Sequence, residues 1–208
     1  MNTKKPPVII GISGGSGSGK TYIAKKLKNS YQKGFVSLVY QDSFYKDLSH
    51  LTFKKRAEQN FDNPNAIDFE LLTQVIKVLS NGNSTKIPIY DFTKHVRTNG
   101  FLDSNSRPII ILDGSLLYTQ SKLLKLIDIK IYIDAPDELR LSRRIMRDTK
   151  ERGRTIDSIN KQYSESVRPM FDQYIAPSKK YADIVINSTK SEKDLIAPIK
   201  NEIDKNLN

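Results

Sequence analysis

A glycine-rich segment near the start of the chain places the strongest constraint on the fold. Residues 14–21 read GGSGSGKT, and their spacing fits G-x-x-x-x-G-K-[ST], in which backbone N–H groups wrap around phosphate oxygens along a path that favours glycine. The apolar run Val8 to Ile12 before it is typical of a strand buried on both faces. After it, Ile23 and Leu27 fall on one face of a helix. We therefore predict a strand, a phosphate-binding loop and a helix in that order.

The predicted loop has a chemical role at most of its positions. Lys20 would reach the β- and γ-phosphates of a nucleotide, and the Thr21 hydroxyl would bind Mg²⁺. The first turn of the helix adds unpaired N–H groups and a positive dipole end. A flexible glycine–serine turn is the alternative, but such a turn requires neither the strand nor the helix. The nucleotide site is predicted to comprise Gly14, Gly15, Ser16, Gly17, Ser18, Gly19, Lys20 and Thr21.

Alternating strand and helix patterns continue through the rest of the chain. Apolar runs typical of strands occupy residues 35–40, 109–113, 129–134 and 182–186. Asp68 is placed to cap a helix that runs to Leu79. Pro136 suits the first turn of a helix that runs to about Thr149. This alternation predicts an α/β fold, a parallel five-stranded sheet with helices on both faces.

The length of the chain sets the expected domain organisation. A chain of 208 residues suits one domain and no second boundary is visible, so residues 1–208 are predicted to form a single domain. Residues 84–101 mix β-forming residues with turn residues and are predicted to form a hairpin outside the main sheet.

Composition excludes several classes of protein. The chain has no cysteine, which rules out a disulfide framework, a thiolate metal site and a cysteine nucleophile. Its net charge of +11 permits an anionic partner without identifying one. No apolar run approaches the roughly 18 residues of a membrane span, and the run near the start is too short for a signal peptide. The expected location is the cytoplasm, with no membrane partner.

Two aspartates follow predicted strands at the carboxyl edge of the sheet, where ligands of open α/β folds bind. Asp42 in VYQDSFY could accept the proton of an acceptor hydroxyl or join a metal shell, or it could start a turn. Asp113 in IIILDG could face Mg²⁺, or it could cap the strand before Gly114. The N-K-x-D and T-K-x-D segments of guanine-specific GTPases are both absent. A kinase that holds a small acceptor is therefore the favoured reaction class.

A basic run follows the fourth predicted strand. Residues 140–154 include seven basic and two acidic side chains. Arg140, Arg144 and Arg147 recur at i, i+4 and i+7, on one helix face. Such a run is usually a solvated face, but beside a phosphate loop it also suits a lid, over about residues 140–155, that covers polyphosphate.

Taken together, six segments resemble the uridine kinase family, also called uridine–cytidine kinases, whose superfamily includes phosphoribulokinase. The resemblance covers about residues 7–187 and is carried by GISGGSGSGKT, QDSFYK, NFDNPNAIDFELL, PIYDFTKHVRT, LSRRIMRDTKERGR and YADIVI. It implies a P-loop NTPase-type fold with a β-hairpin at the acceptor site and an arginine-rich lid. It also implies ATP-dependent, Mg²⁺-assisted phosphorylation of the 5′-hydroxyl of uridine or cytidine, giving UMP or CMP.

The resemblance assigns residues to the phosphate side of the reaction. Asp42 matches the general base for the 5′-hydroxyl. Lys20 belongs to the phosphate loop, and Arg147 and Arg154 match lid residues near the transferred phosphate. The metal side would comprise Thr21, Asp113 and Asp42.

The resemblance also assigns residues to the nucleoside side. Asp62 and Arg144 match residues that hold the ribose 2′ and 3′ hydroxyls, whereas Asp62 alone could be a turn residue. Without the resemblance, His95 would be interpreted as a loop histidine. The rest of the predicted pocket comprises Tyr90 and His95 at the pyrimidine edge, Gln162 on the substrate side, and Tyr45, Phe61 and Phe92 as walls.

The sequence departs from the family at three points. DGSL replaces the usual EGIL, so the carboxylate at position 113 is one methylene shorter and direct binding of Mg²⁺ is open. Asn63 stands where the family frequently has a histidine. After YADIVI the family tends to continue with proline and glycine near the adenine, whereas this chain reads NSTKSEKD. The choice between ATP and GTP as the phosphate donor is therefore open.

Several other functions stay open at this point. Phosphoribulokinases and pantothenate kinases share the loop and fold, but as families they lack this set of acceptor-side segments. The net charge of +11 is also consistent with a nucleic-acid-binding ATPase. The departure DGSL is also consistent with a non-catalytic regulator that only binds nucleotide. The resemblance favours a pyrimidine ribonucleoside as the partner, no nucleic acid, and a homo-oligomer that is usually a tetramer.

Overall fold

The structure is a computed structural model and describes residues 5–207, so residues 1–4 and 208 of the predicted domain lie outside it. The strands are β1 Val8–Ser13, β2 Val36–Tyr40, β3 Thr85–Asp91, β4 Val96–Ser104, β5 Ile109–Asp113, β6 Ile129–Asp134 and β7 Ile184–Asn187. The α-helices are α1 Lys20–Asn29, α2 Phe53–Ala57, α3 Phe69–Ser80, α4 Ser121–Leu124, α5 Asp137–Arg152, α6 Ile156–Gln162, α7 Arg168–Met170, α8 Ala176–Ser178 and α9 Glu192–Leu207.

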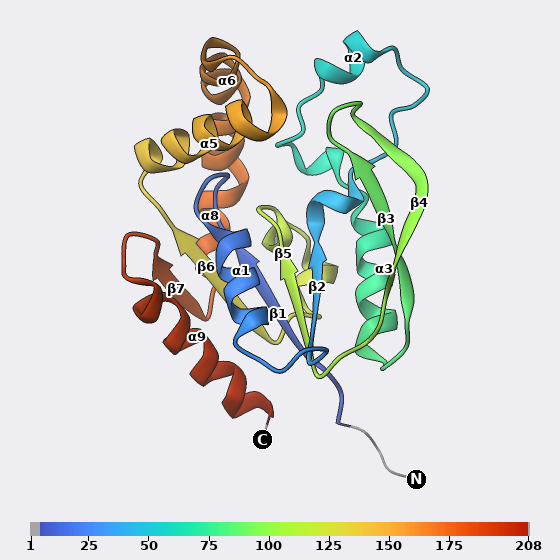
Figure 1. The fold of residues 1–208 in the computed structure, drawn as a ribbon, viewed down its shortest axis with the longest axis vertical. Helices are drawn as coiled ribbons and strands as arrows, with labels where there is room; N and C mark the ends of the chain where they lie inside the picture. Colours follow the sequence, from blue (N-terminus) through green and yellow to red (C-terminus); the bar gives the residue numbers. More distant parts are fainter. Residues whose placement is uncertain (1–4, 208) are drawn as a thin grey trace.

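Five strands form one parallel sheet in the order β2-β5-β1-β6-β7 (Figure 1). The predicted sheet is therefore confirmed. Alternate residues of β1 join two separate apolar cores: Ile9 packs with Leu72 of α3 on one face. On the other face, Ile10 packs with Ile23 and Leu27 of α1. Burial on both faces explains why the run VIIGI has no polar alternation.

The strand register brings three predicted site segments to one edge of the sheet. β5 lies between β1 and β2, and Asp113 pairs with Ile12 on one side and Tyr40 on the other. Because these strands are parallel, their carboxyl ends meet at the same edge. The phosphate loop follows β1, Asp42 follows β2, and Asp113 ends β5.

The α3 helix and the hairpin match the sequence-based expectations closely. The Asp68 side chain accepts a hydrogen bond from the Leu71 N–H at 3.0 Å, and α3 ends at Ser80. The hairpin predicted over residues 84–101 is present as the antiparallel pair β3 and β4 and extends to Ser104.

The α5 helix is longer than predicted. Pro136 is its N-cap rather than a residue of its first turn, and the helix runs to Arg152 instead of Thr149. Gly153 ends it with φ 62°, in the left-handed region that favours glycine. The last turn has no apolar residue, so its helical period was invisible in the sequence.

Helical structure continues without a break from Ile156 to Tyr181. Two π-helical turns, 163–167 and 171–175, separate α6, α7 and α8. The first turn precedes α7, which contains Pro169, and the second precedes α8, which contains Pro177. A proline has no N–H to donate to the carbonyl group one helical turn earlier. In Figure 1 this segment descends from α6 towards β6.

The last helix, α9, was missed by the sequence analysis. Its buried residues Leu195, Ile199 and Ile203 recur every four positions and join the core that contains Ile10. Pro198 lies within it, where a proline usually ends a helix. Within residues 5–207, no helix combines the length and apolar character that crossing a membrane requires.

Gly17 packs the phosphate loop tightly against α5, which gives a stability prediction. A Cβ at Gly17 (φ 80°) would lie 2.3 Å from the Arg140 carbonyl oxygen. Gly82 has φ 81°, but apart from its two chain neighbours no described residue has an atom within 4 Å of an added Cβ. We expect Gly82→Ala to lower the free energy of unfolding by about 1 kcal/mol. Gly17→Ala should lower it by about 2–4 kcal/mol, because overpacking adds to the cost of the left-handed φ.

Denaturant unfolding of wild type and both variants measures the two losses. Gly82→Ala is the matched control, because it has the cost of a left-handed φ without the steric contact. Equal losses in the two variants would contradict the close packing of Gly17 against α5.

Candidate active site

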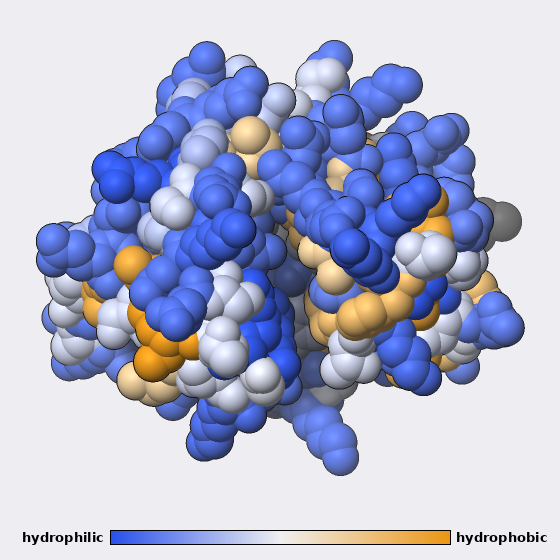
Figure 2. All heavy atoms as spheres, turned by 90° about the horizontal axis from the view of Figure 1, so that it is seen from above, coloured by the Kyte–Doolittle hydropathy of each residue, from blue (hydrophilic) through white to orange (hydrophobic). Residues whose placement is uncertain are grey.

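A hollow opens over the carboxyl edge of the sheet, as Figure 2 shows from above. It separates the half of the molecule with α5 and α6 from the half with α2 and the β3–β4 hairpin. Hydrophilic residues line the side of α5, and hydrophobic residues contribute to the side of the hairpin. A polar wall and a more apolar wall thus face each other.

The loop between β1 and α1 offers groups that suit an anionic ligand. Lys20, the first residue of α1, turns its Nζ back to the Gly15 carbonyl oxygen at 2.9 Å. The Ser18 hydroxyl is buried and has no hydrogen-bond partner among the described residues. Arg144 donates from Nη1 to Ser16 Oγ at 2.9 Å. Cationic groups and an unpaired hydroxyl at a helix N-terminus fit phosphate.

Thr21 and Asp113 bring two oxygen atoms together beside the loop. Thr21 Oγ1 donates to Asp113 Oδ2 at 2.5 Å, so the shorter carboxylate at position 113 still reaches the hydroxyl. Burial raises the pKa of Asp113 above its ordinary value, although Lys20 and Thr21 act to lower it. Mg²⁺ prefers such oxygen ligands and completes its shell with water and phosphate. From residue 5 to residue 207, no group of three or more His, Asp or Glu side chains is placed to hold a metal ion. A metal at Thr21 and Asp113 would therefore need water and phosphate as further ligands.

The charge of Asp42 acts on Lys20 of the phosphate loop and on Asp62. It is partly buried in the 3₁₀ turn Gln41–Phe44, directly after β2. Burial lowers the pKa of Lys20, while the negative charges of Asp113 and Asp42 act to raise it. Burial is also the main cause that raises the pKa of Asp62, and the charge of Asp42 adds to it. Asp42 therefore lies within electrostatic reach of a cation and two other carboxyl groups.

Gln41 ties the end of β2 to the segment after β5. Its buried side chain accepts a hydrogen bond at Oε1 from the Leu116 N–H at 2.9 Å. A Cβ at Gly114 would lie 2.3 Å from that Oε1, so only glycine leaves room for the amide. This contact links the segment that carries Asp42 to the segment that follows Asp113.

Five of the predicted pocket residues form one aromatic cluster on the hairpin side. Tyr45 contacts Phe61 and Tyr90, with ring centroids 5.4 and 5.1 Å apart. Phe92 contacts Tyr90 at 5.4 Å. His95 stacks on Phe61 at 4.9 Å, with 18° between the ring planes. The fold thus brings together side chains from three separate stretches of the chain.

Two members of this aromatic cluster carry polar groups. The Tyr90 hydroxyl is buried without a hydrogen-bond partner in residues 5–207, and burial raises its pKa to about 12. His95 has φ 53°, in the left-handed region. Burial and the charges of Arg56 and Arg154 lower the pKa of His95, so its imidazole is neutral at pH 7, with one donor and one acceptor. The cluster suits a flat ring with polar edges.

Asp62, Arg144 and Gln162 belong to one polar network. Asp62 Oδ1 lies 4.0 Å from Arg144 Nη1. Arg144 donates from Nη2 to Gln162 Oε1 at 2.9 Å, and Arg154 donates from Nη1 to the same oxygen. The network connects the segment before α3 with α5 and α6.

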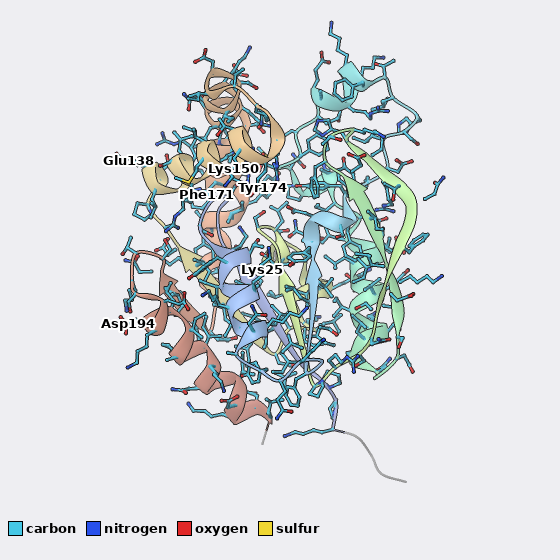
Figure 3. The ribbon with its side chains drawn as sticks, in the orientation of Figure 1. Lys25, Glu138, Lys150, Phe171, Tyr174 and Asp194 are labelled. Atoms are coloured by element: carbon cyan, nitrogen blue, oxygen red, sulfur yellow. The ribbon has the colours of Figure 1, made fainter. Side chains whose placement is uncertain are left out.

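The interpretation of the basic run as a solvated face is wrong for two of its arginines. Arg140 and Arg144 are only 3% and 5% exposed. The Arg140 guanidinium lies 3.6 Å from the centre of the Phe171 ring, which is labelled below α5 in Figure 3. Arg147 donates from Nε to Asp148 Oδ1 at 2.8 Å, and Asp148 is fully buried.

Two polar residues of this region were not among the predicted site residues. Gln41 directly precedes Asp42 and gave no signal of its own. Asp148 entered only as one of the two acids among residues 140–154, although its position four residues after Arg144 was a clue to a shared face. A cavity of about 330 Å³ also borders the site at Phe61; it is lined by Lys46, Leu48, Gln59, Asn60, Phe61, Asn63, Asn65 and Ala66.

Comparison with known proteins identifies the family. A model of the phosphoribulokinase / uridine kinase family matches residues 9–194. The chain is 49% identical over 180 residues to a protein named uridine kinase from Clostridium novyi, covering 86% of each chain. It is 43% identical over 182 residues to a uridine kinase from Streptococcus equi subsp. zooepidemicus, covering 88% of each.

Among solved structures, phosphoribulokinase from Rhodobacter spheroides shares the fold. Its TM-score is 0.66 at 16% identity, over 88% of this chain and 71% of that one. The parallel sheet, the phosphate loop and the family match agree with one another. This chain belongs to the phosphoribulokinase / uridine kinase family.

Proposed function

We propose that this protein is a pyrimidine ribonucleoside kinase, which transfers the γ-phosphoryl group of ATP to the 5′-hydroxyl of uridine or cytidine. The observation that carries the proposal is the position of Asp42 directly after β2, at the sheet edge that it shares with Asp113 and the phosphate loop. Relatives of 43% and 49% identity that are named uridine kinase support this acceptor. A phosphate loop alone would not select it.

On the phosphate side, the loop residues 14–21 would bind ATP. Lys20, Arg147 and Arg154 would stabilise the negative charge of the transferred group. Mg²⁺, when bound, neutralises phosphate charge, and its protein ligands would be Thr21, Asp113 and Asp42. The Thr21–Asp113 contact and the unpaired Ser18 hydroxyl support this assignment.

On the acceptor side, Asp42 accepts the proton of the 5′-hydroxyl as the phosphoryl group is transferred. The Asp62 carboxylate accepts hydrogen bonds from the ribose 2′ and 3′ hydroxyls, and Arg144 donates to them. A carboxylate that needs both hydroxyls discriminates against deoxyribose, because the missing donor leaves it unpaired. Gln162 orients Arg144 through the contact at 2.9 Å.

The aromatic cluster would hold the pyrimidine. Tyr90 donates from its hydroxyl, and neutral His95 offers one donor and one acceptor to the polar edge of the base. Tyr45, Phe61 and Phe92 provide apolar and stacking surface.

A substrate panel tests this function. The protein is incubated with ATP, Mg²⁺ and one of uridine, cytidine, their deoxy forms, ribulose 5-phosphate or pantothenate, and phosphorylated product is measured. We expect UMP and CMP. If only ribulose 5-phosphate or only pantothenate is phosphorylated, the protein is another kinase of this superfamily. Parallel incubations with RNA or DNA measure ATP hydrolysis, and stimulation without any phosphorylated acceptor would indicate a nucleic-acid-binding ATPase. If calorimetry shows that ATP binds but no incubation shows turnover, the protein is a regulator.

Asp42→Asn tests the general base. We expect kcat to fall by about 10² to 10⁴, because the amide cannot accept the proton. The dissociation constant for uridine, measured by calorimetry, should change by less than about threefold, since the amide keeps the size of the carboxylate. Near-normal kcat would reject the assignment of Asp42.

Asp62→Ala tests the ribose contact. We expect KM for uridine to rise roughly 10- to 100-fold, the worth of hydrogen bonds to a charged group. The preference for uridine over 2′-deoxyuridine should also fall. Asp103→Ala, an exposed aspartate on β4, is the matched control and should leave both quantities unchanged. An unchanged KM in Asp62→Ala would count against the contact.

A further inference from the structure

Asp148 lies at the centre of four arginines in α5 and the segment that follows it. Its side chain has no exposed surface. Arg147 Nε donates to Oδ1 at 2.8 Å, and Arg152 Nη1 lies 3.5 Å from the same atom. Arg144 Nε lies 3.5 Å from Oδ2, and Arg154 Nη1 lies 4.0 Å from it. A single carboxylate thus accepts a hydrogen bond from one guanidinium group and lies within 4.0 Å of three more.

The backbone of Asp148 also holds the end of the helix. Its carbonyl oxygen accepts hydrogen bonds from the Gly153 N–H and, at 3.2 Å, from the Arg154 N–H. The point where the chain leaves α5 is therefore fixed relative to the carboxylate. Arg154 is thus tied to Asp148 through its backbone, while its side chain donates to Gln162 and Ser158.

The charge of this carboxylate is maintained by its neighbours. Burial acts to raise the pKa of Asp148, but the hydrogen bond from Arg147 and the charges of Arg147, Arg152 and Arg144 outweigh it, and the pKa lies below its ordinary value. Asp148 is therefore ionised at neutral pH. It offsets the mutual repulsion of four cations that lie within 4.0 Å of it.

The anchored arginines face both sides of the site. Arg144 donates to Ser16 of the phosphate loop and lies 4.0 Å from Asp62 of the acceptor side. Arg147 and Arg154 are the lid residues assigned to the transferred phosphate. The two oxygens of Asp148 have different neighbours. Oδ1 accepts the hydrogen bond from Arg147, and Oδ2 lies at ion-pair distance from Arg144 and Arg154.

We propose that Asp148 is a positioning residue that holds the acceptor-side Arg144 and the phosphate-side Arg147 and Arg154 in one fixed cluster. The proposal rests on the kinase function proposed above. Without the carboxylate, these guanidinium groups would repel one another and adopt several directions, so fewer molecules would present them correctly to the transition state. They would keep their positive charge, so attraction for ATP would persist.

Asp148→Asn tests this role, because it removes the charge and keeps the size of the side chain. We expect kcat to fall about 10²-fold, the cost of misplaced catalytic groups. KM for ATP should not rise, because a negative charge beside the phosphate side has been removed. KM for uridine should rise several-fold through Arg144. A merely structural role would lower the folded fraction without separating kcat from KM for ATP.

Two further variants complete this experiment. Asp157→Asn, an exposed aspartate on α6, is the matched control and should behave as wild type. Asp148→Glu keeps the charge but moves it by one methylene, and we expect kcat about 10-fold below wild type. If Asp148→Asn does not fold, Asp148→Glu carries the test. A kcat within about threefold of wild type in a folded variant at this position would overturn the proposal.

A spectroscopic measurement needs no turnover and separates this proposal from the kinase function. In ¹⁵N-labelled wild type, the Arg147 Nε–H that bonds to Asp148 should give a slowly exchanging signal. Asp148→Asn should exchange this proton faster, because a neutral amide oxygen accepts the hydrogen bond more weakly than a carboxylate does. Wild type that fails to phosphorylate uridine would defeat the proposed function alone, whereas an equally protected Arg147 signal in both proteins would defeat the role of Asp148.

Discussion

The hydrogen-bonded register of β5 between β1 and β2 is the constraint on which the rest of the site depends. Because Asp113 pairs with both Ile12 and Tyr40, the phosphate loop, Asp42 and Asp113 emerge at one edge of the sheet. The two apolar cores on either face hold that register, since a slip by one residue would turn buried side chains to the wrong face. Gln41 adds a direct link between the ends of β2 and β5.

Charge is distributed around this edge in a consistent pattern. Buried or partly buried carboxylates each lie beside cations: Asp113 and Asp42 act on Lys20, Asp62 faces Arg144, and Asp148 anchors the arginines of α5. Such pairing limits the cost of burying ions and leaves cationic groups fixed in direction. A site of this kind suits an anionic substrate opposite a neutral one, which agrees with the kinase function that we propose.

Local signals explain what the sequence predicted well. The phosphate loop, the strands and the Asp68 cap follow from motif, apolar runs and capping chemistry within a few residues of each position. The aromatic cluster became predictable only through the family resemblance, since Tyr45, Phe61 and His95 meet through the tertiary fold. The burial of Asp148 and the contact of Gln41 with Leu116 depend on side-chain packing between distant elements, and no local pattern reports them. The final turn of α5 lacked any apolar residue to reveal its period.

The central claim is that the 5′-hydroxyl of a pyrimidine ribonucleoside meets the phosphate donor at Asp42. A crystal structure with uridine, Mg²⁺ and a non-hydrolysable ATP analogue measures this directly. We predict that the Asp42 carboxylate lies about 2.6–3.2 Å from O5′, with O5′ directed at the γ-phosphate held by residues 14–21. A uridine bound with its 5′-hydroxyl directed away from Asp42, or bound outside the aromatic cluster, would contradict the account.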